Sequence, residues 1–408
     1  MSPSTSATTG PALPAAHVVL ILSLLLGLQP ITTDLYLPAL PALTTGFGAP
    51  MAQAQLTLTA LLLAFGLSQL VWGPLSDRYG RRPILLIGMG AYVLAAVASA
   101  LAPSMALLIV CRTVQGAAMG AGVMCARAIV RDLYSPLQGA RVMSKGLTGL
   151  GIIACVSAPL GGLLSGFFSW RVALLALAVF GAACLTVIAL RFRETRPAMH
   201  RQALKPKALL HTWLSILRHP TFLTFSALSA ASYGGLFTFL AASSFVFIQV
   251  LGLSVTEYGL VMFLNSLLYV LGTLVCRRLL PRMGVSRALA LAGGLSLTGG
   301  TLMGLLALAG FLSVGAIMLP QCLFMLAHGI HQPCSQSGAV GPFPQAAGVA
   351  SALNGFGISL TAFAMGSWLG THLNDTVFPM VLGVWFWSAL IALIDLPAGA
   401  PAVVGAQS

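Results

Sequence analysis

The clearest shortage in this 408-residue sequence is charge, because only 7% of its residues are Asp, Glu, Lys or Arg. A soluble globular domain is about 25% charged. A chain with a mean hydropathy of +0.96 cannot cover a water-facing surface with polar groups. The composition therefore excludes a soluble globular protein and predicts one that is embedded in a lipid bilayer.

Several motifs that carry chemistry are also absent. The seven cysteines form no CxxC pair, so neither a disulfide framework nor a metal site is indicated. The sequence has no G-x-x-x-x-G-K-[ST] loop for nucleotide phosphates and no H-E-x-x-H site. With seven acidic residues, general acid and base chemistry has few candidates. An ATP-driven pump, a membrane-embedded enzyme and a sensor are therefore disfavoured, and we expect no cofactor.

What the sequence has instead is long apolar runs, each near the roughly 20 residues that cross a hydrocarbon core of about 30 Å as a helix. We read the first run as a retained helix and not a secretory signal, because residues 1–16 contain no Lys or Arg. An even number of spans puts both termini on one side. The expected spans lie near 17–37, 54–75, 84–102, 106–126, 146–167, 171–192, 221–247, 258–280, 288–309, 312–333, 347–369 and 377–396.

The basic residues gather in four stretches between these runs. Of the 20 Lys and Arg residues, all but Arg112 and Arg171 lie in 78–82, 127–145, 191–218 and 277–287. Cytoplasmic loops are rich in Lys and Arg. We therefore expect a multi-pass protein of the cytoplasmic (inner) membrane with both termini in the cytoplasm. The net charge of +13 then reports topology and not a nucleic-acid partner.

One polar segment divides the chain. The stretch 193–219 is basic and interrupted by proline, and we interpret it as a cytoplasmic linker between two six-helix bundles, 1–192 and 220–408. The bundles echo each other, since "GPLSDRYGRR" from Gly73 has a degenerate counterpart in "GTLVCRRLLPRMGVSR" from Gly272. We expect an all-α membrane protein with twelve transmembrane helices in two pseudo-symmetric bundles, an arrangement found in carriers built from parallel repeats.

Five stretches carry a resemblance to a known family. "GPLSDRYGRRP" resembles the loop between helices 2 and 3 of the major facilitator superfamily, and "RTVQGAAMGAG" is similar to its helix 4 signature. "GLGIIACVSAPLGG" resembles the helix 5 antiporter signature, although Ala158 stands where a glycine usually precedes Pro159. "TTDLYLPALPAL" and "PFPQAAGVASALNG" are similar to drug/proton antiporters of the bicyclomycin and chloramphenicol resistance branch. The resemblance covers essentially all twelve spans and implies the major facilitator fold in a monomer.

The loop between helices 2 and 3 concentrates charge in a chain that has little. The resemblance implies that it latches the two bundles on the cytoplasmic side, with Asp77 facing basic groups or the positive end of helix 11, near Ala346. Gly73 lets another helix approach closely. The alternative is that the arginines only anchor the topology. The residues assigned to this latch are Gly73, Asp77, Arg78, Gly80, Arg81 and Arg82.

A carboxyl group within the membrane is the sharpest functional candidate. We take Asp34 to be the only acid inside the twelve spans, where an ionised carboxylate costs on the order of 3 kcal/mol. A rise of about 1.5 Å per residue places Asp34 and Arg112 in one outer layer, so the two can pair. We hypothesise that Asp34 takes a proton from outside and releases its partner or a cationic substrate, and the resemblance implies a proton-relay role for Arg112. The alternative is that Asp34, between Pro30 and Pro38, only caps irregular backbone.

Polar and aromatic residues inside apolar spans are candidates for a substrate cavity, because such a mixture suits drug-like ligands. His328 and His331 share a helix face and can titrate near neutral pH. A neutral, hydrogen-bonded histidine is the commoner outcome, and two histidines do not make a zinc site. Pro159, Gly161 and Gly162 are expected to bend helix 5 and bring it close to a neighbour. The cavity candidates are Tyr36, Gln115, Tyr233, Phe237, Asn265, His328, Gln332 and Asn354.

Together these features predict a secondary exporter that moves small amphipathic or cationic drugs outward against inward proton flow. Its partners are then a small-molecule substrate, protons and the lipid bilayer. A metabolite exporter for an amino acid, a nucleoside or a siderophore is the alternative, because one scaffold can carry unrelated compounds.

Overall fold

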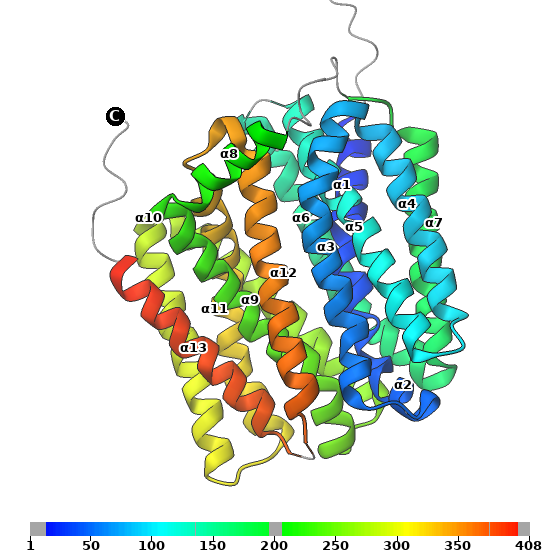
Figure 1. Cartoon of the computed structure of the whole chain (residues 1–408). Coiled ribbons are helices and arrows are strands. Elements are labelled where there is room, and N and C mark those ends of the chain that lie inside the picture. The colour runs from blue at the N-terminus through cyan, green and yellow to red at the C-terminus, as the bar shows by residue number, and fades with distance from the viewer. Residues whose placement is uncertain (1–13, 135, 196–205, 375, 399–408) are drawn as a thin grey trace, which may run out of the picture.

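The computed structural model describes residues 14–134, 136–195, 206–374 and 376–398, and every regular element in these ranges is helical (Figure 1). The N-terminal group consists of α1 (Ala15–Asp34), the 3₁₀ turn η1 (Leu37–Ala39), α2 (Leu40–Phe47), α3 (Met51–Tyr79), α4 (Arg81–Ala100), α5 (Met105–Leu133), α6 (Pro136–Phe167) and α7 (Trp170–Arg191). After α8 (Pro206–Leu217), the C-terminal group consists of α9 (Pro220–Ser244), the π turn η2 (Phe245–Val250), α10 (Val255–Leu308), α11 (Val314–Val340), the 3₁₀ turn η3 (Pro344–Ala346), α12 (Ala347–His372) and α13 (Phe378–Ala398).

Within the described residues, eleven helical stretches are long and apolar enough to cross a membrane. One of them, α10, has 54 residues. At about 1.5 Å per residue it would reach about 80 Å, more than twice a hydrocarbon core of about 30 Å. Gly284 breaks it with a φ of 73°, so α10 consists of two legs, 255–283 and 285–308. The predicted all-helical membrane architecture is confirmed, and the spans expected near 258–280 and 288–309 form one bent element.

Several helices extend beyond the predicted spans. Most of 127–145, expected as an interhelical stretch, is helical, because α5 continues to Leu133 and α6 begins at Pro136. The stretch 277–287 lies inside α10, and the proposed linker 193–219 contains α8. Long basic side chains can reach water from a helix that still runs beside the apolar layer. Hydropathy therefore marks where the apolar layer ends and not where the helix ends.

Local sequence sets where helices begin and break. Ser104 starts α5, where its Oγ accepts a hydrogen bond from the N–H of Leu107 at 3.3 Å. Ser254 starts α10 in a capping box with Glu257. Gly80 alone joins α3 to α4 with a φ of 95°, a conformation that other residues rarely adopt. Between such signals the helices continue, because any other backbone would leave N–H and C=O groups unpaired in lipid.

The two groups touch along two pairs of helices. α3 packs against α12, and α6 packs against α10; Figure 1 shows α3 beside α12 near the middle of the molecule. Small residues set these contacts: a Cβ on Gly66 of α3 would overlap Ser359, and one on Gly370 of α12 would lie 3.1 Å from the Cα of Ala52. Small residues allow membrane helices to approach closely. The space between the groups is therefore bounded by these two helix pairs.

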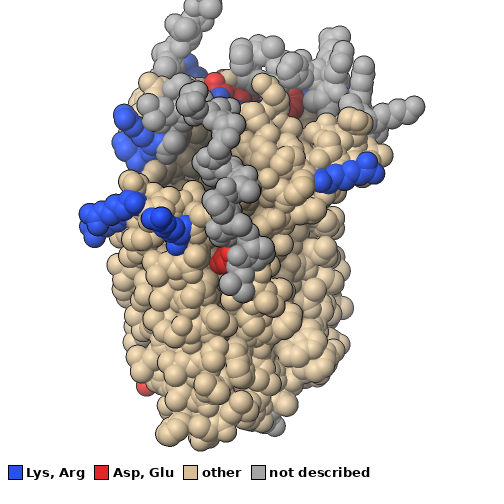
Figure 2. Space-filling model, turned by 90° about the vertical axis from the view of Figure 1, so that its left-hand side faces the viewer, with Lys and Arg blue, Asp and Glu red and all other residues tan. Residues whose placement is uncertain are grey.

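The two ends of the molecule differ in charge. Figure 2 shows Lys and Arg gathered toward its upper end, which in Figure 1 also carries α8. We call this the basic end, and we call the opposite end, which carries α2, the far end. Between them the outer helix faces expose large apolar side chains, such as Leu94 (73% exposed) and Val179 (69%). This apolar belt is the surface that a bilayer would cover.

Candidate functional site

Arg112, in α5, is a fully buried cation. Its Nη1 donates to Oε1 of Gln115 at 2.8 Å, and its Nη2 donates to the carbonyl oxygen of Thr32 in α1 at 3.0 Å. Its Cζ lies 4.3 Å from the centroid of the Tyr36 ring, a cation–π contact. Nε has no hydrogen-bond partner. A buried arginine held only by neutral groups is poorly compensated, so this cation is suited to attract a carboxylate.

Asp34 is the last residue of α1 and has 9% of its surface exposed. Its Oδ1 accepts a hydrogen bond from the hydroxyl of Thr33 at 2.8 Å. The next residue, Leu35, packs against Gly161 of α6, and Gln29 of α1 bonds to Tyr233 of the C-terminal group. The carboxyl group therefore sits at the boundary between the two groups and away from bulk water.

Asp34 and Arg112 are not paired, although Arg112 contacts α1 near Asp34. The Nη2 of Arg112 reaches the backbone of α1 at Thr32, two residues before Asp34. The carboxylate is bonded to Thr33, and the guanidinium is bonded to Gln115 and Thr32. An ion pair between the two side chains is not formed in this structure. The pairing stays a prediction, and it would require the Asp34 side chain to change partner.

Two tyrosines support this arrangement. The hydroxyl of Tyr36 lies 2.7 Å from Oγ1 of Thr57, and the hydroxyl of Tyr92 lies 2.7 Å from Oγ1 of Thr32. All four side chains are buried. Tyr36, expected to line a substrate cavity, is thereby held with its ring against Arg112. The sequence analysis does not select Tyr92, which lies in an ordinary apolar run.

Two hydrogen bonds join the groups near this site. Nε2 of Gln29 donates to the hydroxyl of Tyr233 at 3.1 Å, and Nε2 of Gln55 donates to the carbonyl oxygen of Ala241 at 2.5 Å. The Tyr233 ring is stacked on Phe237, with centroids 6.3 Å apart. The sequence pattern predicts Tyr233 and Phe237 as site residues but not Gln29 and Gln55. An amide inside an apolar run is the signal that could have identified both.

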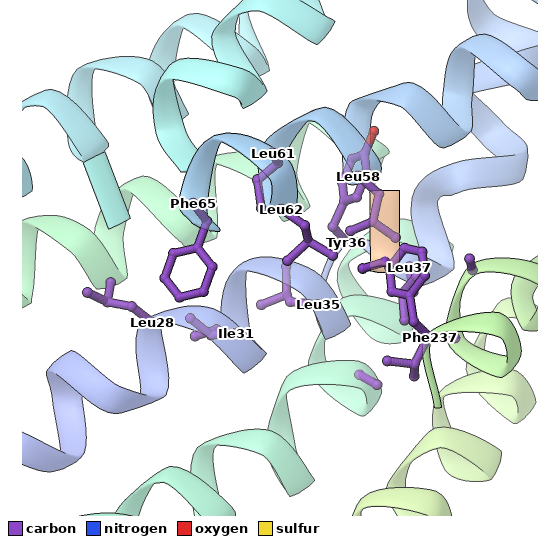
Figure 3. Close-up of a cluster of buried hydrophobic side chains, with 14 of the residues drawn as sticks. Leu28, Ile31, Leu35, Tyr36, Leu37, Leu58, Leu61, Leu62, Phe65 and Phe237 are labelled. Atoms are coloured by element: carbon purple, nitrogen blue, oxygen red, sulfur yellow. The ribbon is translucent and has the colours of Figure 1, made fainter. Parts of the chain in front are cut away.

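Apolar side chains fill the space beside these polar groups. Figure 3 shows this buried cluster, whose labelled members come from α1, η1 and the two residues between them, from α3 and from α9: Leu28, Ile31, Leu35, Tyr36, Leu37, Leu58, Leu61, Leu62, Phe65 and Phe237. Phe237 belongs to the C-terminal group, so the cluster crosses the boundary. A mostly apolar wall with a few placed polar groups suits an amphipathic ligand.

The cavity candidates of α11 are bonded to α9. Nδ1 of His328 lies 2.8 Å from Oγ of Ser232, and Nε2 of Gln332 donates to the carbonyl oxygen of Ser229 at 3.1 Å. Both α11 side chains are buried. His328 is thus a hydrogen-bonded histidine inside the C-terminal group, which is the alternative that the sequence left open.

Two amides complete the candidate set. Oδ1 of Asn265, in the first leg of α10, accepts a hydrogen bond from Nε2 of Gln321 at 3.3 Å. Asn354, in α12, is buried and its Oδ1 has no protein partner. Buried amide oxygens normally find a donor. Asn354 is therefore the member of the set with free capacity to accept a hydrogen bond from a ligand.

His331 points to a second buried acid. Its Nε2 lies 3.2 Å from Oδ2 of Asp395 in α13, and the two residues are 0% and 7% exposed. Asp395 lies inside the last predicted span, 377–396, so the expectation that Asp34 is the only acid within the spans is wrong. The residue comes one position before the end of that range, where the sequence does not show whether a carboxyl is buried. Its partner is 64 positions away along the chain.

The loop after α3 forms a charged cluster around Arg81, which is 1% exposed. Its Nη2 lies 2.8 Å from Oδ1 of Asp77, and its Nε lies 2.9 Å from Oδ2 of Asp132. Its Nη1 donates to Oγ of Ser76 at 2.6 Å. Arg131 lies 3.7 Å from Asp77. All of these residues belong to α3, α4 and α5, so the cluster ties the N-terminal group to itself.

Glu194, which the sequence pattern does not indicate, lies three residues after the end of α7 and holds the same loop. Its two carboxylate oxygens accept hydrogen bonds from the backbone N–H groups of Arg81 at 2.9 Å and Arg82 at 3.0 Å. This places a negative charge at the N-terminus of α4, where it is favourable. Gly80 leaves the necessary room, because a Cβ there would lie 2.5 Å from Oε2 of Glu194. Nε of Arg82 donates to the carbonyl oxygen of Phe192 at 3.0 Å.

The two other latch candidates, Arg78 and Gly73, lie outside the charged cluster around Arg81. Arg78 is exposed, with its guanidinium 5.2 Å from the centroid of the Tyr79 ring. Gly73 faces α5, where a Cβ would lie 3.4 Å from the terminal methyl group of Met124. Gly73 therefore serves close helix packing within the N-terminal group.

Two arginines of α5 contact α12 at the basic end. Nη1 of Arg127 donates to Oγ of Ser351 in α12 at 2.7 Å. A Cβ on Gly348, at the start of α12, would lie 3.2 Å from Nη1 of Arg131. Asp77 thus approaches the first turn of α12 through Arg131. The latch stays a proposal, and Arg127 and Arg131 are the residues through which it would act.

The helix 5 candidates place α6 between the groups. A Cβ on Gly161 would overlap the carbonyl group of Leu35, just after α1. One on Gly162 would lie 2.9 Å from the carbonyl oxygen of Val255, at the start of α10. Pro159 lies inside the same helix. α6 therefore has a close neighbour in each group, where the sequence analysis expects one.

A metal site or a pair of reactive thiols would be a different kind of functional site. Within the described residues no group of three or more His, Cys, Asp or Glu is placed to hold a metal ion. The Sγ atoms of Cys276 and Cys334 lie 3.7 Å apart, and both thiols are free. Their spacing in the sequence does not indicate this proximity.

The fold and the site together define a polytopic membrane carrier, in which two groups of membrane-spanning helices enclose buried charged and polar side chains at their boundary. The chain belongs to the Major Facilitator Superfamily, whose family model matches residues 22–367.

Several curated relatives of this chain are named as resistance proteins. Multidrug resistance protein D of Escherichia coli (strain K12) is 31% identical over 341 residues, which are 83% of this chain and 84% of that protein. The bicyclomycin resistance protein homolog of Haemophilus influenzae is 27% identical over 364 residues, 89% of this chain and 91% of that protein. A chloramphenicol resistance protein of Pseudomonas aeruginosa is 30% identical over 380 residues, 90% and 87%. The resemblance predicted from the motifs is confirmed.

Solved structures show the same fold. The xylose transporter of E. coli, in a partially occluded inward-open conformation, has a TM-score of 0.72 at 14% identity and covers 97% of this chain and 99% of its own. The human organic anion transporter has a TM-score of 0.65 at 22% identity, with 94% and 99% covered. At these identities the likeness concerns the fold alone.

Proposed function

We propose that this protein is a secondary exporter that moves small amphipathic or cationic drugs across the cytoplasmic membrane in exchange for protons. Membership of the Major Facilitator Superfamily supports transport. Relatives at 27–31% identity are named for resistance to multiple drugs, bicyclomycin and chloramphenicol, which supports drugs as the substrate class. The proton gradient supplies the energy, so the scheme requires neither a cofactor nor a catalytic step.

The observation that carries this proposal is the buried carboxyl group of Asp34 at the boundary of the two groups. An ionised carboxylate inside a membrane is costly unless another group offsets its charge. A proton, the guanidinium of Arg112 or the cationic part of a substrate can each do so. One carboxylate that can accept only one of these partners at a time provides the competition that exchange requires.

The exchange of substrate for proton then depends on which group offsets the charge of Asp34. A proton from outside neutralises Asp34, and a cationic substrate leaves. Loss of that proton to the cytoplasm restores the negative charge, which attracts the next substrate or Arg112. Two features of Arg112 support this step. Its Nε has no hydrogen-bond partner, and its Nη2 already donates to the carbonyl oxygen of Thr32, two residues before Asp34.

We assign the basic end to the cytoplasm, since cytoplasmic loops are rich in Lys and Arg. Both termini then lie in the cytoplasm, and Asp34, at the end of α1, lies nearer the outside. A single chain contributes both groups, and we infer that it acts as a monomer.

Alternating access would open the two ends of the boundary in turn. The Arg127–Ser351 hydrogen bond lies at the basic end, and the close approach of Gly162 to Val255 lies at the far end. Contacts at opposite ends are suited to closing one side each. In this scheme Asp77 and Arg81 keep the N-terminal group rigid while it moves as a unit.

The test is transport into inside-out membrane vesicles with an imposed pH gradient, using a panel of cationic and neutral drugs. We expect Asp34→Asn to reduce proton-driven transport by at least about tenfold, because a charge term on the order of 3 kcal/mol is removed. Glu257→Gln, which alters an exposed acid of the α10 cap, is the matched control and should transport normally. Full proton-driven transport by Asp34→Asn would refute the role of Asp34. Failure of the unaltered protein to transport any compound would refute the exporter.

A further inference from the structure

His331 and Asp395 form a buried acid–base pair that the scheme above does not use. α11 begins at Val314 and α13 at Phe378, both at the far end, and each partner lies 17 positions into its helix. At about 1.5 Å per residue, both lie about 25 Å from the start of their helices. The pair therefore occupies one depth, in the part of the membrane layer nearer the basic end.

Spare hydrogen-bonding capacity surrounds this pair. Nδ1 of His331, Oδ1 of Asp395 and Oγ of Ser296 are buried without a protein partner. Ser296 lies in the second leg of α10, one turn after Gly293, where a Cβ would overlap Oδ2 of Asp395. A buried polar atom without a partner is costly. A tie whose only role is to hold helices together would not leave a polar atom without a partner on each of its two members.

Few other titratable groups face the pair. His328 lies one turn away on α11, and Tyr269 of α10 reaches as far as His328, with ring centroids 5.5 Å apart. Cys334, also on α11, lies against Cys276 of α10. α9, which packs on both α11 and α13, contacts α11 through the hydroxyl groups of Ser229 and Ser232. Within the described residues, no Lys or Arg forms an ion pair with Asp395.

We propose that His331 and Asp395 together bind one proton and form a second proton site, located in the C-terminal group. With one proton, held on the imidazole beside the ionised carboxylate, the pair is neutral overall. Without it a lone carboxylate is left in the membrane layer, and with a second proton a lone imidazolium is left. Each of those states carries an uncompensated buried charge. The titration therefore belongs to the pair and not to either residue.

The proton is the ligand that fits this site. The pair offers one imidazole and one carboxylate, whereas zinc sites take three or four protein ligands. Asp395 lies three residues before Ala398, the last residue of α13, and retains 7% exposure. The site therefore exchanges protons with the water at the basic end.

Proton binding itself does not depend on the proposed function, but its consequence for transport rests on it. Loss of the proton weakens the tie between α13 and α11, the helix that also carries His328 and Gln332. The packing of the C-terminal group would then depend on the pH at the basic end, while the protonation of Asp34 would depend on the pH at the far end.

The test is histidine NMR on the full-length protein, labelled with ¹⁵N-histidine and reconstituted in lipid nanodiscs. The His331 signal is identified by its absence from His331→Gln. In the unaltered protein we expect it to pass from the protonated to the neutral form in one step as the pH is raised. In Asp395→Asn the imidazole loses its anion and takes up its proton only at a pH lower by at least about one unit. His372, which is exposed at the end of α12, is the internal reference and should titrate identically in both.

A His331 signal that does not titrate would overturn the proposal, and so would a midpoint that Asp395→Asn leaves unchanged. The double variant H331Q/D395N covers the case that single variants fail to fold, because its two neutral amides can keep a hydrogen bond. After a pH jump in unbuffered solution with an indicator dye, we expect it to release one proton fewer than the unaltered protein. Equal release would also overturn the proposal.

Transport separates this site from Asp34. Asp395→Asn should move the pH of half-maximal transport, whereas Asp34→Asn should remove the dependence on the proton gradient. If Asp34→Asn keeps its coupling, the proposed function fails. The titration of His331 in nanodiscs is unaffected by that outcome and decides the second site alone.

Discussion

Two glycines break helices at the basic end, one in each group, and the protein surrounds them differently. Gly80 joins α3 to α4 with φ 95° and ψ 163°, and Gly284 divides α10 with φ 73° and ψ 175°. A Cβ on Gly80 would meet the carboxylate of Glu194, whereas one on Gly284 would meet nothing within 4 Å. The backbone shape is repeated in the two groups, while the packing around it is not.

The arginines near the two breaks differ in the same way. Arg81 is buried between Asp77 and Asp132, whereas Arg278 and Arg282 are exposed. A helix break that only reverses the chain, with arginines that only anchor the membrane topology, needs no buried ion pairs. The break at Gly284 is of this kind. The break at Gly80 has additional constraints. This contrast gives Arg81 a structural role within the N-terminal group, while the topology anchor suffices for the arginines around Gly284.

The largest expected difference comes from removing an arginine at each break. Arg81→Ala would leave Asp77 and Asp132 without their shared buried cation, and we expect it to lower the free energy of unfolding by about 3 kcal/mol. Arg282→Ala alters an exposed side chain and should change that free energy by less than about 0.5 kcal/mol. Thermal or denaturant unfolding of the purified proteins in detergent measures both. Equal effects would mean that the buried cluster contributes nothing beyond an exposed charge.

A smaller difference should appear when each glycine becomes alanine. Both conformations are in a region that is essentially restricted to glycine, so each substitution should cost on the order of 1 to 3 kcal/mol. Gly80→Ala should cost more than Gly284→Ala, because its Cβ also displaces Glu194. The same unfolding measurements rank the two variants. A larger loss in Gly284→Ala would contradict the view that only the first break is tightly packed.

The smallest expected effect concerns the carboxylate at the start of α4. Glu194→Gln keeps its size but removes the negative charge next to two backbone N–H groups, and we expect a loss of about 0.5 to 1 kcal/mol. Because Glu194 is exposed, the loss should shrink when salt is raised to about 1 M. Arg287→Gln, near the second break, is the matched control and should show neither effect. A loss that does not respond to salt would indicate packing and not charge as the role of Glu194.

Much of the fold follows from the sequence because lipid restricts what a chain can do. Apolar runs of the right length must be helices, since no other open backbone satisfies its hydrogen bonds in a bilayer. The expected spans therefore match the observed helices, including the two legs of α10. The helix ends are less predictable, because α5 carries Arg127 and Arg131 as an ordinary helix beyond its apolar run.

The site is less predictable because side-chain partners depend on rotation and on distant chain segments. The depth of a residue in its helix follows from its position, and Arg112 does reach α1 at Thr32. The choice of Thr33 as the partner of Asp34 depends on a side-chain rotamer, which position does not specify. Glu194 acts 113 positions from Arg81, and Asp395 lies 64 positions from His331. Neither partnership has a signal in local spacing.

The open surroundings of Gly284 have a practical consequence. A chain that changes direction in free space, with no neighbour to displace, can accept an inserted folded domain at that point. A fluorescent protein inserted there would be attached to the C-terminal group. A dye on a cysteine engineered at the exposed Arg78 would be attached to the N-terminal group. Resonance energy transfer between the two fluorophores would then report, in living cells, the distance between the N-terminal and C-terminal groups during transport.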